Sequence, residues 1–195
     1  HGESKYIDCM ERTLYNGVIS GMSMDGGRFF YPNPLSSDGK YKFNADGNTT
    51  RQPWFGCACC PSNLCRFIPS VPGYLYGVKD NNIYVNLFAG NTSTIKVNGK
   101  DVVLEETTEY PWNGDIKIAV KKSGVKNANL LVRIPGWVRN QVVPSDLYKY
   151  SDAEKPAYSV TVNGKAVEAD LNANKGYLPV KNIKKGDVIR IHFDM

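Results

Sequence analysis

The spacing of apolar residues divides the chain into two parts with different periods. Between Glu3 and about Ser20, apolar or small residues recur at steps of three and four, which is the period of an amphipathic α-helix. They are Tyr6, Cys9, Met10, Thr13, Leu14 and Gly17, and Ile7 and Val18 widen the same face. We therefore predict one helix here, with an apolar face that needs a partner.

The segment that follows has no sustained period. It is rich in Gly, Pro, Ser and Asp around a short aromatic strand predicted at Arg28–Tyr31, so we expect an irregular hairpin or loop. Pro61 falls where the first turn of a helix accepts proline. We predict a short helix at Ser62–Ile68, which Pro69 and Pro72 would end.

After Gly73 the period changes to two, which is typical of half-buried β-strands. The candidate strands are residues 74–76, 83–87, 94–97, 116–120, 129–134, 159–162 and 188–193. Asp80-Asn81-Asn82 is predicted to be a tight turn, and VNGK at 97–100 and 162–165 carries an Asn-Gly pair that suits a two-residue hairpin. Many short strands with such turns predict an antiparallel β-sandwich, so the fold class is mainly β.

Composition and charge narrow the possible functions. A chain of 195 residues with 42% hydrophobic composition can bury a core, and it is long enough for one domain or a domain with an appendage. The net charge of +5 comes with 24 basic residues that are scattered along the chain, so no nucleic-acid partner is predicted. No apolar run approaches the roughly 20 residues of a membrane-spanning helix, so no membrane partner is predicted either.

Candidate chemistry is concentrated in WFGCACCPSN at residues 54–63, which holds three of the five cysteines. An odd number of cysteines cannot pair fully within one chain, and the adjacent Cys59 and Cys60 are poorly placed to bond each other. Cys9 and Cys65 lie in the two predicted helices, where we expect them to pack in the core, and Cys57 is expected to be a packed or loop thiol. A structural zinc site normally has two separated pairs of ligands, and the remaining Cys9 and Cys65 do not form a second pair. The cluster is therefore at most half of a structural metal site.

Two other interpretations of the cluster concern thiolate chemistry. Cys57 and Cys60 form a CxxC motif, but no βαβ pattern of a thioredoxin-like redox site precedes it. If Pro61 is the first helical residue, Cys59 and Cys60 lie at a helix N-terminus, where the helix dipole and unpaired amides stabilise a thiolate. The residues alone leave disulfide, redox, metal and nucleophile interpretations open, and the last is chemically plausible.

The tandem Cys-Cys-Pro-x-Asn of ACCPSN is accompanied by other distinctive runs. These are ERTLYNGVISGMSMDG and RFFYPNPL before it, and ETTEYPWNGDIKI, LLVRIPGW and GYLPVKNIKKGDVIRIHFDM after it. Together they resemble glycoside hydrolase family 127, the β-L-arabinofuranosidase family once called domain of unknown function 1680. The resemblance implies that residues 1–72 are the end of an (α/α)6 catalytic barrel with the cysteine loop, and that residues 73–195 are a β-sandwich domain.

The same resemblance implies a retaining glycosidase in which a zinc-bound cysteine replaces the usual carboxylate nucleophile. Cys59 matches the nucleophile and zinc ligand, and Cys60 matches a second zinc ligand. In the family a Glu-x-Cys arrangement earlier in the chain completes the ligands, and an acid glutamate protonates the leaving group. This sequence contains no Glu-x-Cys. We therefore expect a fragment whose full-length parent binds zinc and acts on an arabinose-containing glycan. The fragment alone is expected to bind zinc weakly or not at all and to lack activity.

Exposed aromatic residues support a competing hypothesis, a carbohydrate-binding module. Tyr110, Trp112, Trp137 and Tyr177 lie in predicted loops or strand ends, where rings can stack on sugars. The simpler expectation is that Trp112 and Trp137 plug the ends of the sandwich, and a third hypothesis is a purely structural sandwich. The apolar helix face also predicts self-association. The compartment stays unknown, with a periplasmic or secreted location slightly favoured.

Overall fold

The computed structural model describes residues 2–57, 59–151 and 157–195 and has a mainly β fold. Two compact units divide the chain: one comprises His1–Cys9 and Tyr74–Met195, and the other comprises Met10–Gly73. The first unit contains all the strands, whereas the second contains helices and a long irregular segment. No helix in the described ranges is long and apolar enough to cross a membrane.

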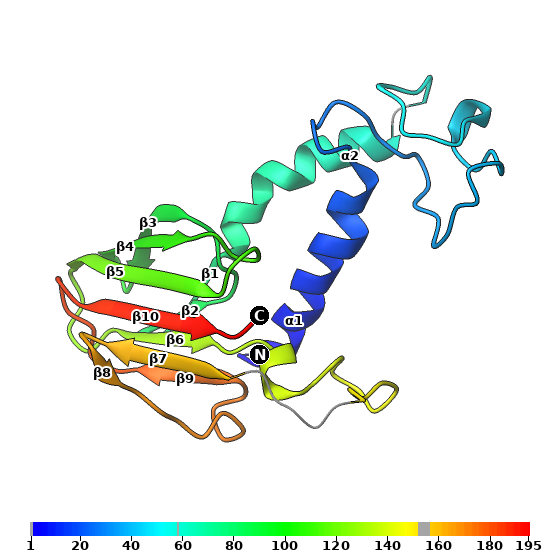
Figure 1. The fold of residues 1–195 in the computed structure, drawn as a ribbon. Helices are drawn as coiled ribbons and strands as arrows, with labels where there is room; N and C mark the ends of the chain where they lie inside the picture. The colour runs from blue at the N-terminus through cyan, green and yellow to red at the C-terminus, as the bar shows by residue number, and fades with distance from the viewer. Residues whose placement is uncertain (1, 58, 152–156) are drawn as a thin grey trace. The chain divides into compact units, whose positions relative to one another are not determined.

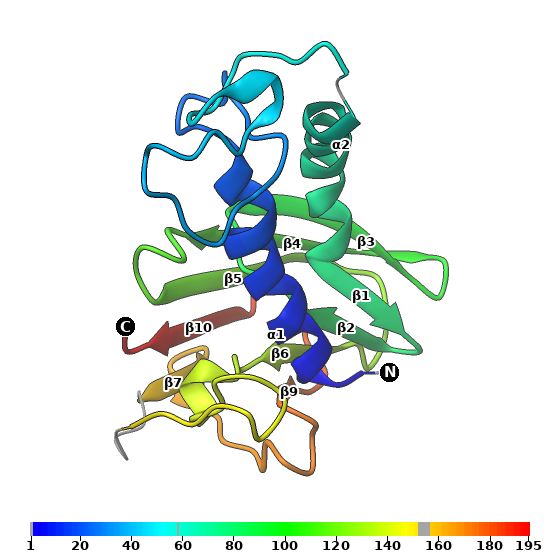
Figure 2. The same cartoon turned by 90° about the vertical axis from the view of Figure 1, so that its right-hand side faces the viewer.

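The strands form two sheets that lie as layers over a common core (Figure 1, Figure 2). The four-stranded sheet has the order β1 (Tyr76–Lys79), β2 (Asn82–Val85), β6 (Asn129–Arg133) and β9 (Tyr177–Val180). The six-stranded sheet has the order β3 (Asn91–Val97), β4 (Lys100–Thr108), β5 (Asp115–Ser123), β10 (Val188–Phe193), β7 (Tyr158–Val162) and β8 (Lys165–Ala166). This arrangement confirms the predicted mainly β sandwich.

Strand pairing is antiparallel except between β2 and β6, which run parallel. Both VNGK segments form the predicted two-residue hairpins, because Val97 pairs with Lys100 and Val162 with Lys165. The Asn and Gly of each turn have positive φ, which is the geometry that an Asn-Gly pair adopts readily. The turn predicted near residue 80 is also present, between Lys79 and Asn82. The local turn chemistry therefore specifies these hairpins correctly.

Alternating side chains of both sheets fill the core. The pattern is clearest in β5, where Ile116, Ile118 and Val120 are buried and the residues between them point outward. Three strands were not among the predicted ones, namely β4, β8 and β9. In β4, Glu106 occupies an inward position and interrupts an otherwise regular apolar alternation. β9 contains a proline, and β8 is only two residues long.

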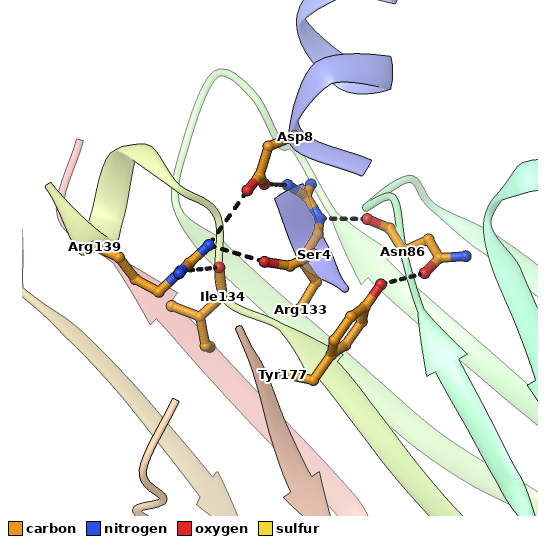
Figure 3. Close-up of polar contacts among 7 residues, drawn as sticks. All are labelled: Ser4, Asp8, Asn86, Arg133, Ile134, Arg139 and Tyr177. Atoms are coloured by element: carbon orange, nitrogen blue, oxygen red, sulfur yellow. Dashed lines mark hydrogen bonds and ion pairs between the residues drawn. The ribbon is translucent and has the colours of Figure 1, made fainter. Parts of the chain in front are cut away.

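An ionic cluster around the buried Arg133 holds the start of the N-terminal helix to the sandwich (Figure 3). Arg133 of β6 is 0% exposed; its Nη1 donates to Asp8 Oδ1 at 2.7 Å and its Nε donates to the carbonyl of Asn86. Arg139 Nη2 donates to Ser4 Oγ at 2.8 Å and contacts Asp8 Oδ2 at 3.3 Å. Asp8 thus bridges two arginines, and this bridge explains why the first residues of the helix belong to the sandwich unit.

The N-terminal helix changes its geometry along its length. α1 spans Ser4–Thr13, a π-helical segment follows at Leu14–Val18, and a 3-10 turn ends at Gly21. The predicted helix from Glu3 to about Ser20 is therefore helical almost throughout, although not as one regular α-helix. Its predicted apolar face stays partly open, because the Tyr6 side chain is 50% exposed.

The segment before Tyr74 corrects three predictions. Arg28–Tyr31 is not a strand, because only Phe29 forms isolated bridges, to Met22 and Gln52. α2 spans Cys59–Phe67, so it begins before the predicted Ser62. A 3-10 helix at Ile68–Tyr74 then continues through the two prolines expected to end the helix. The φ angle of proline is compatible with helical backbone, so the prolines change the helix type without ending it at once.

Candidate functional site around Cys59

Cys59 and Cys60 are the first two residues of α2. Backbone amides of a first helical turn have no partner within the helix, and the helix dipole is positive at this end. Such a position therefore stabilises the thiolate form of a cysteine relative to its thiol form. None of the five cysteines, all of which lie in the described ranges, forms a disulfide. The position thus agrees with the expectation of a helix N-terminal thiolate, with the helix starting two residues earlier than Pro61.

Tyr31 supplies the main side-chain contact of Cys59. Its hydroxyl oxygen lies 2.6 Å from Cys59 Sγ. The Tyr31 backbone amide donates to Asn44 Oδ1 at 2.8 Å, and Asn44 in turn donates to the carbonyl of Thr50. The ring of Tyr31 also packs edge-on against the buried Phe55, with centroids 5.5 Å apart. These contacts lock the tyrosine within the irregular segment, so its hydroxyl is held at the sulfur.

The environment drives the two adjacent thiols toward different protonation states. The hydrogen bond from Tyr31 lowers the pKa of Cys59 below the ordinary thiol value. Desolvation raises the pKa of Cys60, and its hydrogen bond and proximity to Cys59 act in the same direction. The thiols of Cys59 and Cys57 raise the pKa of Tyr31, which keeps its hydroxyl protonated as the donor. Cys59 is therefore the thiol of this pair that ionises first.

The donor set is incomplete for a closed zinc site. Cys59 Sγ and Cys60 Sγ lie 3.9 Å apart, and thiolates are suitable zinc ligands. Across residues 2–57, 59–151 and 157–195, however, no group of three or more His, Cys, Asp or Glu side chains is arranged to hold a metal ion. Structural zinc sites use four protein ligands and catalytic sites use three. The described residues therefore fit half of a zinc site and do not fit a whole one.

The other cysteines differ in part from their expected environments. Cys57 lies in the loop before α2 and is exposed, as expected for a loop thiol. Cys9 and Cys65 were expected to pack in the core, and both are exposed, so these two expectations are wrong. In α2 the buried residue is Pro61, and Cys65, one helical turn later on the same side of the helix, is exposed.

Sequence reasoning did not identify Tyr31 as a candidate residue of this site. It lies 28 positions before Cys59 in a segment without periodicity, and no spacing rule connects the two residues. The only signal was that Tyr31 belongs to RFFYPNPL, one of the runs that resemble the family. That resemblance assigned no role to any residue of the run.

The aromatic residues of the sandwich divide into packed and exposed ones. Tyr177 is buried, and Tyr110 and Trp137 pack against the core, where Trp137 lies 5.9 Å from the ring of Phe193. The expectation that Trp137 closes an end of the sandwich is therefore confirmed. Trp112 is 85% exposed, so the same expectation is wrong for this residue.

Comparison with known proteins agrees with these motifs. Residues 1–73 match the family model described as the catalytic domain of glycoside hydrolase family 127, β-L-arabinofuranosidase. Residues 82–195, more than half of the chain, match the middle domain of the same family. The chain therefore belongs to glycoside hydrolase family 127, and it comprises the C-terminal end of the catalytic domain and the middle domain.

Individual relatives show the same correspondence. The chain is 30% identical to the non-reducing end β-L-arabinofuranosidase of Bifidobacterium longum subsp. longum, over 99% of this chain and 27% of that protein. A solved family 127 β-arabinofuranosidase is 56% identical with a TM-score of 0.89, over 100% of this chain and 29% of that one. A β-L-arabinofuranosidase from Geobacillus stearothermophilus T6 is 35% identical with a TM-score of 0.76, over 98% and 28%. The chain thus spans less than a third of the length of these relatives.

Proposed function

We propose that this chain supplies the cysteine nucleophile of a retaining glycosidase that acts on β-L-arabinofuranosides in arabinose-containing glycans. The observation that carries the proposal is the hydrogen bond between Tyr31 and Cys59 at the start of α2, which lowers the pKa of the Cys59 thiol. Membership of glycoside hydrolase family 127 and the names of the relatives support the choice of sugar.

The proposed reaction places Cys59 opposite the leaving group. Its thiolate attacks the anomeric carbon, the bond to the leaving oxygen breaks, and that oxygen takes a proton from a carboxylic acid. Water then hydrolyses the bond between Cys59 and the sugar, with overall retention of configuration. Tyr31 holds the sulfur in place and favours the thiolate by donating its hydroxyl hydrogen.

The described residues do not supply all the zinc ligands or the general acid that the proposed reaction needs. We propose that Cys59 and Cys60 provide two of the zinc ligands, and that a Glu-x-Cys segment and an acid glutamate come from outside these 195 residues. Bound zinc would hold thiolates deprotonated. Losing two ligands removes most of the metal affinity, and losing metal and acid together removes both activation of the nucleophile and protonation of the leaving group. The isolated chain is therefore proposed to be inactive.

The test is hydrolysis of p-nitrophenyl β-L-arabinofuranoside, with metal content measured alongside. We expect no turnover by the 195-residue chain, and turnover by a longer form that includes a Glu-x-Cys segment and the acid glutamate. In that longer form Cys59→Ser should abolish turnover, because a hydroxyl is a far weaker nucleophile at neutral pH. Cys65→Ser is the matched control, since Cys65 is an exposed thiol of the same helix. Turnover by the short chain that is lost in Cys59→Ser would contradict the proposed division of the site.

The two parts of the chain are assigned different roles in this proposal. Residues 1–72 are proposed to form the end of the catalytic barrel with the cysteine loop, whereas residues 73–195 form the β-sandwich domain. The half-exposed Tyr6 on α1 supports a further part of the proposal, that an isolated chain self-associates through this helix face. Sedimentation of wild type and Tyr6→Ser at several concentrations tests it, and a monomer throughout would contradict it.

A further inference from the structure

A polar groove lies on the outer face of the six-stranded sheet. Its volume is about 470 Å³, and its side chains come from β4, β5, β10 and β7. Strand register aligns Thr107, Lys117, Arg190 and Thr161 as one row across these strands. With neighbouring strands about 4.8 Å apart, the row extends for roughly 14 Å. The groove is thus long enough for a chain-like ligand.

Lys117 and Arg190 place two positive charges side by side in this row. They are direct cross-strand partners, and like charges in such positions repel each other. The ion pairs among the described residues include neither of them, and Glu105, near Lys117 on β4, pairs with Lys121 at 3.1 Å. Two adjacent cations without a carboxylate in an ion pair with either of them form a site where binding of an anion is favourable.

A second row, one step along the strands, carries groups that bind hydroxyls. Asp115, His192 and Ser159 are aligned across β5, β10 and β7. His192 Nδ1 lies 2.7 Å from Asp115 Oδ1, and Nε2 lies 3.1 Å from Asp194 Oδ1. Both carboxylates thus face His192, and the ion pairs among the described residues join neither of them directly to Lys117 or Arg190. Free acceptor positions on these oxygens suit the hydroxyl groups of a sugar.

Trp112 provides an exposed apolar surface in the turn that joins two of the strands lining the groove. It lies in the turn between β4 and β5, three residues before Asp115, and it is 85% exposed. The neighbouring Tyr110 instead packs against the core, so the turn itself is anchored while Trp112 is left in solvent. Large exposed aromatic rings beside polar groups are typical of surfaces that stack on sugar rings.

We propose that this groove binds an acidic oligosaccharide, with the carboxylate of a uronic acid unit held by Lys117 and Arg190 and a neighbouring sugar ring stacked on Trp112. The arginine guanidinium can hold a carboxylate through two parallel hydrogen bonds, and the lysine adds a point charge. Thr107 and Thr161 flank this pair and can hydrogen-bond the sugar hydroxyls. The proposal adds a glycan-binding surface to the sandwich and does not depend on the chemistry of Cys59.

Calorimetric titration of the 195-residue chain with α-1,4-trigalacturonic acid tests the proposal. The neutral control ligand is α-1,4-galactotriose, which has the same linkage and lacks only the carboxylates. We expect saturable binding of the acid, at least about tenfold weaker binding of the neutral sugar, and a similar loss in Lys117→Gln/Arg190→Gln. Trp112→Ala should weaken binding of the acid roughly 2- to 10-fold.

The control protein is Lys165→Gln/Lys185→Gln, which loses the same charge at exposed positions outside the groove. It should bind trigalacturonic acid like the wild type, and circular dichroism should show the same fold in all variants. Absence of saturable binding, equal affinity for the neutral sugar, or equal loss in the control protein would overturn the proposal. Competition by sodium sulfate at the affinity of the oligosaccharide would show a general anion site and would also overturn it. Undiminished binding by Trp112→Ala would overturn the stacking contact.

Discussion

Glu106 places an ionisable group between the two sheets of the sandwich, and it should make stability depend on pH. The residue lies on β4 and is 2% exposed. Its Oε2 accepts from the Tyr76 hydroxyl of β1 at 2.9 Å, and its Oε1 accepts from the Ala89 amide at 3.1 Å. Burial raises the pKa of Glu106 to about 7, because the hydrogen bonds compensate only part of the lost hydration.

The size and sign of the effect follow from linkage between proton binding and folding. In the unfolded chain the carboxyl has an ordinary pKa near 4.5, so the two values differ by about 2.5, which corresponds to about 3 kcal/mol. Between these pKa values the folded state retains a proton that the unfolded state has released. The free energy of unfolding therefore falls as pH rises from about 4.5 through about 7, and the full penalty is present above that range.

Glu106→Gln tests this reasoning because it removes the charge and keeps a side chain of the same shape. Urea denaturation should show that wild type loses about 3 kcal/mol relative to this variant between about pH 4.5 and about pH 8. Glu105→Gln is the matched control, since Glu105 is the preceding residue of β4 and its ion pair with Lys121 is solvent-accessible. A constant difference between wild type and Glu106→Gln over this range would refute the argument.

Two further predictions concern single contacts. With zinc chelated, Tyr31→Phe should slow alkylation of Cys59 by iodoacetamide at neutral pH, because loss of the hydroxyl raises the pKa of this thiol. Peptide mass spectrometry measures the rate of alkylation, and Tyr41→Phe, at an exposed tyrosine, is the control. An unchanged rate in Tyr31→Phe would contradict the prediction. Asp8→Ala should reduce the free energy of unfolding by about 3 kcal/mol, because it leaves the buried Arg133 without this ionic partner. Urea denaturation measures the loss, and a change within about 0.5 kcal/mol would show that the ion pair is dispensable.

The fold was predictable where local chemistry decides the structure. The Asn-Gly pairs at 98–99 and 163–164 require positive φ, and both hairpins form as expected. β4 was missed for a physical reason: its inward row includes Glu106, and a charged residue in a core position breaks the pattern on which strand prediction depends. The parallel pairing of β2 with β6 joins strands that are far apart in sequence, so no local pattern can reveal it.

The candidate site shows the same limit at the level of chemistry. The tandem cysteines were identified from sequence because Cys59 and Cys60 are adjacent and precede a proline. Their difference comes from three-dimensional contacts: Tyr31 donates to one sulfur, whereas burial disfavours the charge on the other. Two chemically identical thiols thus acquire different acidities from neighbours that the sequence does not place beside them. The more acidic of the two thiols is therefore identified only by the folded loop that carries Tyr31, since the motif supplies both cysteines and the loop distinguishes their pKa values.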